Sequence, residues 1–177
     1  MRRDQAALII VDMQEKFEKA IVDFSSIEEK IVMLIEGSKI LNLPIYYTEQ
    51  YPKGLGRTTS KISNHLEDLK PIEKNRFSAA DEKFITILRE KQVSQIILTG
   101  IEAHVCVLQS ALDFYNLGFQ VHVVSDATGS RTIDNRAAAL ARMRGQGVIE
   151  TVVESVLFEL LDMSGTEEFR RISKLLK

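Results

Sequence analysis

The sequence predicts an α/β fold of three layers, in which a doubly wound, mostly parallel sheet carries helices on both faces. Strand-like runs alternate with segments of helical period along the chain, which is the pattern of βαβ units. Two of the runs, 6–11 and 95–99, are rich in Ile, Leu and Val, as strands covered on both faces are. The 177 residues match one ordinary domain with a sizeable core, so we expect a single domain over 1–177.

Five short apolar runs are predicted to be strands, the last of them weaker than the others. They are 6–11, 44–48, 95–99, 120–124 and 148–152. Five segments have helical period: 27–40, 80–91, 107–118, 137–147 and 169–176. Ser25 and Ser26 are candidate caps for the first helix, and Leu117-Gly118 suits the end of the third. The stretch 49–71 shows little period, which fits either a functional loop or a solvated excursion.

The composition argues against several classes of partner. Hydrophobic residues make up 45% and charged residues 27% of the chain, as in ordinary globular proteins. The net charge of −2 offers no excess of cations for a run of phosphates, so we expect no nucleic-acid partner. The apolar run 6–11 is too short to span a bilayer, and no cleavage site follows Arg2-Arg3-Asp4. These features predict a cytoplasmic protein with no membrane partner.

Chemically useful residues follow the predicted strands. Ligands of open α/β sheets bind outside the carboxyl ends of the strands. Asp12 follows the first strand, Glu49 and Gln50 follow the second, 100–106 follows the third, and Ser125-Asp126 follows the fourth. A carboxylate and the single thiol, Cys106, are therefore expected on the same edge of the sheet. A charge placed like Asp12 requires a partner, unless it caps the next segment.

The single cysteine leaves two interpretations open. One cysteine excludes an internal disulfide and any multi-cysteine metal site. Cys106 is either a small buried hydrophobe or a reactive thiol. At the first turn of a predicted helix, backbone N–H groups and the helix dipole would lower its pKa. The same N–H groups would hold a developing oxyanion. His104, two residues away, is a candidate base, and an ammonium such as that of Lys74 would help to ionise the thiol and a carboxylate partner.

Other site motifs are absent. The histidines His65, His104 and His122 lack metal-ligand spacing. The chain contains no GxxxxGK[ST], and Asp12-Met13-Gln14 stands after the first strand in place of GxGxxG. The usual nucleotide-binding sites are therefore disfavoured.

Three motifs resemble those of the isochorismatase-like cysteine hydrolases. They are Leu8-Ile9-Ile10-Val11-Asp12-Met13-Gln14, Glu73-Lys74, and Thr99-Gly100-Ile101-Glu102-Ala103-His104-Val105-Cys106-Val107. Val123-Val124-Ser125-Asp126-Ala127 is similar to the family's fourth strand, and the resemblance runs from Ala7 to Val156. The run Thr48-Glu49-Gln50-Tyr51-Pro52-Lys53-Gly54-Leu55-Gly56 is most similar to the isochorismatase domain-containing subgroup.

The resemblance implies a catalytic triad of Asp12, Lys74 and Cys106 and a non-proline cis peptide between Ile101 and Glu102. It also implies an oxyanion hole made by the backbone N–H groups of Glu102 and Cys106. The activity implied is hydrolysis of a small amide or related C–N bond. Nicotinamidases of the family carry metal-binding histidines after the second strand, where this chain has Thr48-Glu49-Gln50-Tyr51. We therefore expect no metal and no other cofactor.

Several alternatives stay open. The chain would otherwise be a vinyl-ether hydrolase of the isochorismatase type, or a catalytically quiet binding or scaffold protein. Glu102 is bulkier than the residue common there in relatives, so it would either narrow the pocket or bind a cationic substrate group. The candidate pocket residues are Gln14, Gln50, Tyr51, Phe77 and His104. Family likeness also implies a homo-oligomer, a dimer or higher, in which the helix 133–147 packs on a partner or on its own sheet.

Overall fold

The computed structural model describes residues 1–177 and contains one six-stranded sheet in which every pair of neighbours is parallel. The strand order is β3-β2-β1-β4-β5-β6, which reverses direction between β1 and β4. This is the doubly wound order whose ligands bind at the reversal point. The strands are β1 (Ala6–Val11), β2 (Ile45–Gln50), β3 (Ile72–Lys74), β4 (Gln95–Ile101), β5 (Gln120–Gly129) and β6 (Ile149–Thr151).

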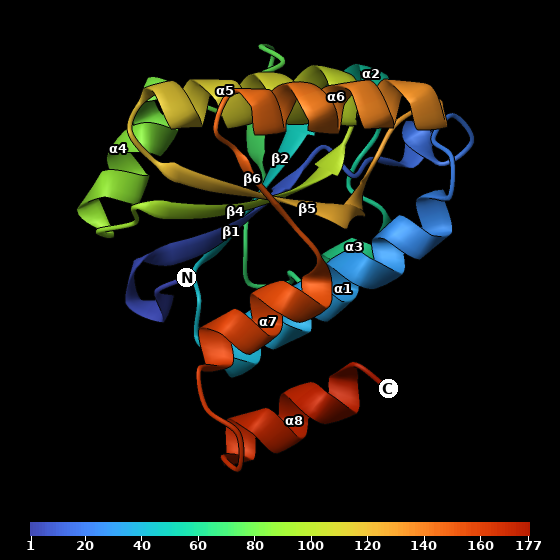
Figure 1. The fold of residues 1–177 in the computed structure, drawn as a ribbon. Helices are drawn as coiled ribbons and strands as arrows, with labels where there is room; N and C mark the ends of the chain where they lie inside the picture. The colour runs from blue at the N-terminus through green and yellow to red at the C-terminus, as the bar shows by residue number, and fades with distance from the viewer.

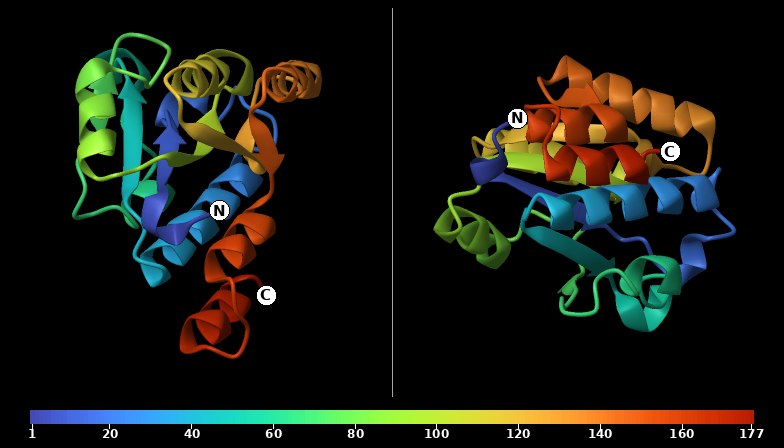
Figure 2. Two further views of the ribbon diagram at one scale, coloured as in Figure 1. Left: turned by 60° about the vertical axis from the view of Figure 1, so that its left-hand side comes forward. Right: turned by 90° about the horizontal axis from the view of Figure 1, so that it is seen from below.

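Helices cover both faces of the sheet, as Figures 1 and 2 show. One face carries α1 (Phe24–Ile40), α3 (Ser60–Ser63) and α7 (Val153–Leu161), with α8 (Glu167–Leu175) outside α1 and α7. The other face carries α4 (Glu82–Glu90), α5 (Leu108–Asn116) and α6 (Ile133–Gly145). Shorter turns are η1 (Arg3–Gln5), η2 (Glu15–Phe17), α2 (Pro52–Leu55) and the π-helical η3 (Ala103–Val107). None of the helices has the length and apolar character needed to cross a membrane. The parallel sheet with helices on both faces confirms the predicted fold class.

The first strand explains why the protein has two cores. All six residues of β1 are buried, and its side chains point alternately to the two faces. Leu8 and Ile10 pack in the core beneath α1 and α7, whereas Ile9 and Val11 pack in the core beneath α4, α5 and α6. A continuous apolar run is therefore what this position requires.

The structure differs from the sequence-based expectation at four places. β3 is a three-residue edge strand with two charged residues, so it has no apolar run to reveal it. The helix α7 was not predicted. The first helix begins at Phe24 after Asp23, which is left-handed at φ 57, and not at the expected serine caps. The stretch 49–71 extends β2 to Gln50 and holds the short helices α2 and α3. Gly118, at φ 89, does follow the end of α5.

The buried His122 in β5 is expected to make stability depend on pH. Its Nε2 has no hydrogen-bond partner, and burial lowers the pKa of this imidazole, with a smaller opposing effect from Glu159 and a lowering effect from the amino terminus. A histidine with a lowered folded pKa leaves stability intact above its unfolded pKa of about 6.5 and destabilises the fold as pH drops below that value. The added destabilisation levels off once pH is below the folded pKa.

The measurement is the melting temperature of wild type and His122→Gln between pH 7.5 and 5. Because all other titrating groups are shared, the difference between the two curves isolates His122. We expect the wild type to lose more stability than the variant as pH falls through 6.5. Parallel curves would contradict this account.

Candidate active site

The three residues of the predicted triad come together where the strand order reverses. Asp12 follows β1 directly, Lys74 ends β3, and Cys106 lies in η3, just after β4. Lys74 Nζ donates to Asp12 Oδ2 at 2.6 Å. The charge and hydrogen bonding of Asp12 also raise the pKa of the Cys106 thiol, so the two groups are neighbours. One carboxyl group therefore binds the ammonium group and lies beside the thiol.

The Asp12 carboxylate is buried and held from two sides. Thr48 Oγ1, in β2, donates to Asp12 Oδ1 at 2.6 Å, while Lys74 occupies the other oxygen. The backbone N–H of Asp12 also donates to the carbonyl of Thr48 at 3.2 Å. Pairing with a cation offsets the cost of burying this charge. Asp12 thus binds partners across the sheet and does not cap the following segment. Thr48 was not predicted as a site residue, since nothing in the sequence places it beside Asp12.

The Lys74 ammonium is saturated with acceptors. Besides Asp12, it donates to Gln50 Oε1 at 2.8 Å and to the carbonyl of Phe77 at 2.9 Å, and a longer contact of 3.3 Å reaches the carbonyl of Arg76. Three donors is the full capacity of an ammonium group. Its side chain is only 6% exposed. Parallel pairing of β2 with β3 sets Gln50 beside Lys74, which explains how a short edge strand fixes the cation.

The expected low pKa of Cys106 is wrong. The pKa of this thiol is raised to about 12, chiefly by burial and in addition by the charge and hydrogen bonding of Asp12. The charge of Lys74 and a hydrogen bond from the Glu102 backbone act in the opposite direction. The start of a helix favours a thiolate only where desolvation is modest, and Cys106 is 6% exposed. The resting thiol is therefore neutral at neutral pH.

The loop that leads to Cys106 has a close-packed backbone. The peptide bond between Ile101 and Glu102 is cis. Gly100, just before it, has a φ of 111°, and a Cβ there would lie 2.1 Å from the carbonyl oxygen of Val11. Only glycine allows β4 to approach β1 this closely, beside the residue that precedes Asp12.

Glu102 and His104 face the end of β5. Two hydrogen bonds, of 2.7 and 2.9 Å, join the Glu102 carboxylate to the guanidinium group of Arg131. The charge of this carboxylate is therefore already balanced by Arg131, which argues against one of its two expected roles, the binding of a cationic substrate group. His104 Nδ1 lies 3.0 Å from Ser130 Oγ. Asp12, and not His104, is among the groups that shift the pKa of the Cys106 thiol. The sequence carries no signal for Arg131, which lies 29 residues from Glu102.

The other predicted pocket residues have different roles. Gln14 is buried, and its amide binds the backbone of Gln50 and Gly56, so it anchors the loop after β2 and is not free for a substrate. Tyr51 and Phe77 are more than half exposed. Tyr51 and Lys74 share a pocket of about 370 Å³, which has one triad residue, Lys74, in its lining. Its lining residues are Tyr51, Pro52, Lys53, Glu73, Lys74 and Asn75.

Glu49 stands at the end of β2, the region in which this chain lacks the metal-binding histidines of the nicotinamidases that it resembles. Its buried carboxylate accepts hydrogen bonds from the N–H and hydroxyl of Thr58 and from Arg57. It therefore fastens the loop that carries Tyr51 onto the sheet. No group of three or more His, Cys, Asp or Glu side chains is arranged to hold a metal ion.

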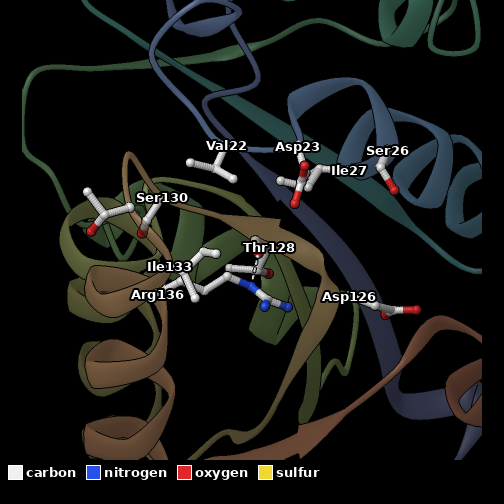
Figure 3. A pocket seen from close by; sticks show the side chains of 10 residues that line it. Val22, Asp23, Ser26, Ile27, Asp126, Thr128, Ser130, Ile133 and Arg136 are labelled. Carbon is white, nitrogen blue, oxygen red and sulfur yellow. Dashed lines mark hydrogen bonds between the residues drawn. The ribbon is translucent and has the colours of Figure 1, made fainter.

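A second cavity, of about 220 Å³, lies between the starts of α1 and α6 (Figure 3) and has no triad residue in its lining. Arg136 reaches across it to the carbonyl oxygens of Thr128, at 2.8 Å, and of Ser125. The lining residues are Val22, Asp23, Ser26, Ile27, Asp126, Thr128, Ser130, Thr132, Ile133 and Arg136.

Comparison with known proteins places this site in a family. The family model described as Isochorismatase domain matches residues 6–154. The chain belongs to the isochorismatase family. It is 39% identical to isochorismatase domain-containing protein 2 of Danio rerio, over 97% of this chain and 86% of that one, which supports the predicted subgroup.

Two solved structures resemble this chain in sequence and in fold. The MAR1 ribonuclease of Caenorhabditis elegans is 38% identical, with a TM-score of 0.94 over 99% of this chain and 91% of that one. YcaC from Pseudomonas aeruginosa, described with hexane-2,5-diol and covalent acrylamide, is 26% identical, with a TM-score of 0.89 over 97% of this chain and 89% of that one. The likeness extends over nearly the whole chain in both cases.

Proposed function

We propose that this isochorismatase-family protein is a cysteine hydrolase that cleaves a small amide or related C–N bond through Asp12, Lys74 and Cys106. The observation that carries the proposal is the single buried carboxyl group that binds a fully bonded ammonium and lies beside a neutral thiol. Such a group can accept the thiol proton when the thiol attacks and return it later. YcaC, described with covalent acrylamide, supports a reactive group on this fold.

The first half-reaction forms a thioester. Because the pKa of Cys106 is near 12, the thiol loses its proton to Asp12 as its sulfur attacks the carbonyl carbon, and not before. Lys74 keeps its charge and stabilises the sulfur as negative charge develops on it. The carbonyl oxygen becomes an oxyanion, which accepts from the backbone N–H groups of Glu102 and Cys106. Collapse breaks the C–N bond, and the proton on Asp12 leaves with the amine.

The second half-reaction restores the enzyme. Asp12, again a carboxylate, accepts a proton from water as the water oxygen attacks the thioester carbon. A second oxyanion forms at the same N–H groups and collapses to the carboxylic acid and the thiolate. The thiolate then recovers its proton from Asp12, so that one water is consumed for each C–N bond cleaved.

A panel of small primary amides, with ammonia release as the readout, tests the proposal. Isochorismate and an RNA oligonucleotide form the two other arms, since the first tests vinyl-ether cleavage and the second the activity named for the Caenorhabditis relative. We expect at least one amide to be hydrolysed, with an acyl adduct on Cys106 visible by intact mass spectrometry in the early phase. Turnover of isochorismate or RNA without any amide hydrolysis or acyl adduct would overturn the proposal.

A further inference from the structure

We propose that Arg131 is a positioning residue, whose ion pair with Glu102 holds the Glu102 backbone N–H against the sulfur of Cys106. The proposal rests on the proposed function, because the Glu102 N–H is the donor to the oxyanion of the proposed hydrolysis. It assigns a role in the reaction to a residue that lies outside the triad and on a different segment of the chain.

The pair has the geometry of a fixed clamp. Arg131 Nε donates to Glu102 Oε2 at 2.7 Å and Nη2 donates to Oε1 at 2.9 Å, which is the planar two-bond arrangement that arginine favours with carboxylates. The Glu102 side chain is 6% exposed, whereas that of Arg131 is 62% exposed. The guanidinium therefore covers a nearly buried carboxylate. A second contact, between His104 and Ser130, ties the same two segments together.

Glu102 is the residue through which such a clamp would reach the nucleophile. Its carbonyl accepts from the N–H groups of Val105 and Val107 at 3.0 and 3.2 Å, so it anchors the first turn of η3. Its backbone also acts to lower the pKa of the Cys106 thiol, as an N–H group near the sulfur does. A shift of Glu102 would therefore move the turn that carries Cys106 and the N–H that faces the sulfur.

Loss of the guanidinium would produce such a shift. An unpaired carboxylate is costly to bury, so Glu102 without Arg131 would turn toward water and draw its backbone with it. Lysine would preserve the charge but offer a point charge in place of the two parallel N–H groups, so it would restore the position in part. The Arg131 side chain itself is 62% exposed, so its replacement leaves the core packing intact, and the effect sought is one on reaction geometry.

Two reactions of Cys106 distinguish an effect on the oxyanion donors from an effect on the accessibility of the thiol. Acylation of Cys106 by p-nitrophenyl acetate passes through an oxyanion, whereas alkylation by iodoacetamide does not. Changes in burial or in thiol ionisation alter both rates, so the ratio of the acylation rate to the alkylation rate reports oxyanion stabilisation. The variants are Arg131→Met and Arg131→Lys. The matched control is Arg3→Met, which breaks a two-bond pair with Glu168 at the other end of the sheet.

We expect Arg131→Met to lower the ratio about tenfold, less than the 10²–10³ that outright removal of an oxyanion donor costs. Arg131→Lys should fall between that value and the wild type, and Arg3→Met should equal the wild type. In a Glu102→Ala background, Arg131→Met should have no further effect, because the clamp is already lost.

An unchanged ratio in Arg131→Met and Arg131→Lys would overturn the positioning role, even if amides are hydrolysed. A lowered ratio, together with turnover of isochorismate or RNA but of no amide, would leave the positioning role standing and overturn the proposed function alone. A wild type that is alkylated but never acylated would overturn both.

Discussion

Replacement of Cys106 by alanine is expected to abolish amide hydrolysis, with kcat lowered by at least about 10³-fold. Without the sulfur no thioester can form, and the buried Asp12 carboxylate alone offers no covalent route. The protein should still fold, since Cys106 is a small side chain among apolar neighbours and loses one atom. Initial rates and melting temperature are the two measurements.

The matched control for this variant is Val105→Ala, which truncates a partly buried side chain on the same turn, η3. It should keep most of its activity, because its side chain takes no part in the chemistry. A Cys106→Ala protein that still turns over its substrate would exclude covalent catalysis by sulfur. In that event, isochorismate cleavage becomes the leading explanation, since it needs no thiol.

The sequence predicted the sheet well where burial alone dictates the residues. β1 and β4 are covered on both faces, so their nearly continuous runs of Ile, Leu and Val identify them as central parallel strands. β3 could not be found in this way, because it lies at the edge of the sheet, spans three residues and carries Glu73 and Lys74. The position of β3 is set by its pairing with β2, and this pairing cannot be predicted from the residues of β3 alone.

The residues of the candidate site also fall into those that the sequence predicted and those that only the folded chain shows. Asp12 and Cys106 follow strong strands, so their place on one edge of the sheet could be inferred from residue order. Thr48 lies 36 residues from Asp12, and Arg131 lies 29 residues from Glu102. No local sequence pattern predicts contacts over such separations. The pKa of Cys106 was mispredicted for a related reason. The start of a helix, which lowers the pKa of a thiol, can be predicted from the local sequence. The burial that raises the pKa of Cys106 by more depends on how the whole chain packs.

Replacement of Asp12 by asparagine is expected to have opposite effects on two reactions of one thiol. Amide hydrolysis should fall by at least about 10²-fold, since the variant lacks the group that accepts and returns the proton. Alkylation of Cys106 by iodoacetamide near pH 8 should become faster. After burial, the charge and hydrogen bond of Asp12 are what raise the pKa of Cys106, and the asparagine removes that charge while Lys74 remains.

The size of the gain follows from two opposing effects. Each unit by which the pKa falls gives about ten times more thiolate at a pH well below the pKa. The less basic thiolate is a weaker nucleophile, which returns about half of that gain on a logarithmic scale, so the net increase is about threefold per unit.

Lys74→Met provides the opposite control for Asp12→Asn. The ammonium lowers the pKa of Cys106, so its loss should slow alkylation, and it should slow hydrolysis as well. The two variants therefore agree in turnover and disagree in alkylation, a pattern that general damage to the site does not produce. If Asp12→Asn slowed both reactions as Lys74→Met does, Asp12 would act by holding the Lys74 ammonium in place, and the proton carrier of the mechanism would have to be another group.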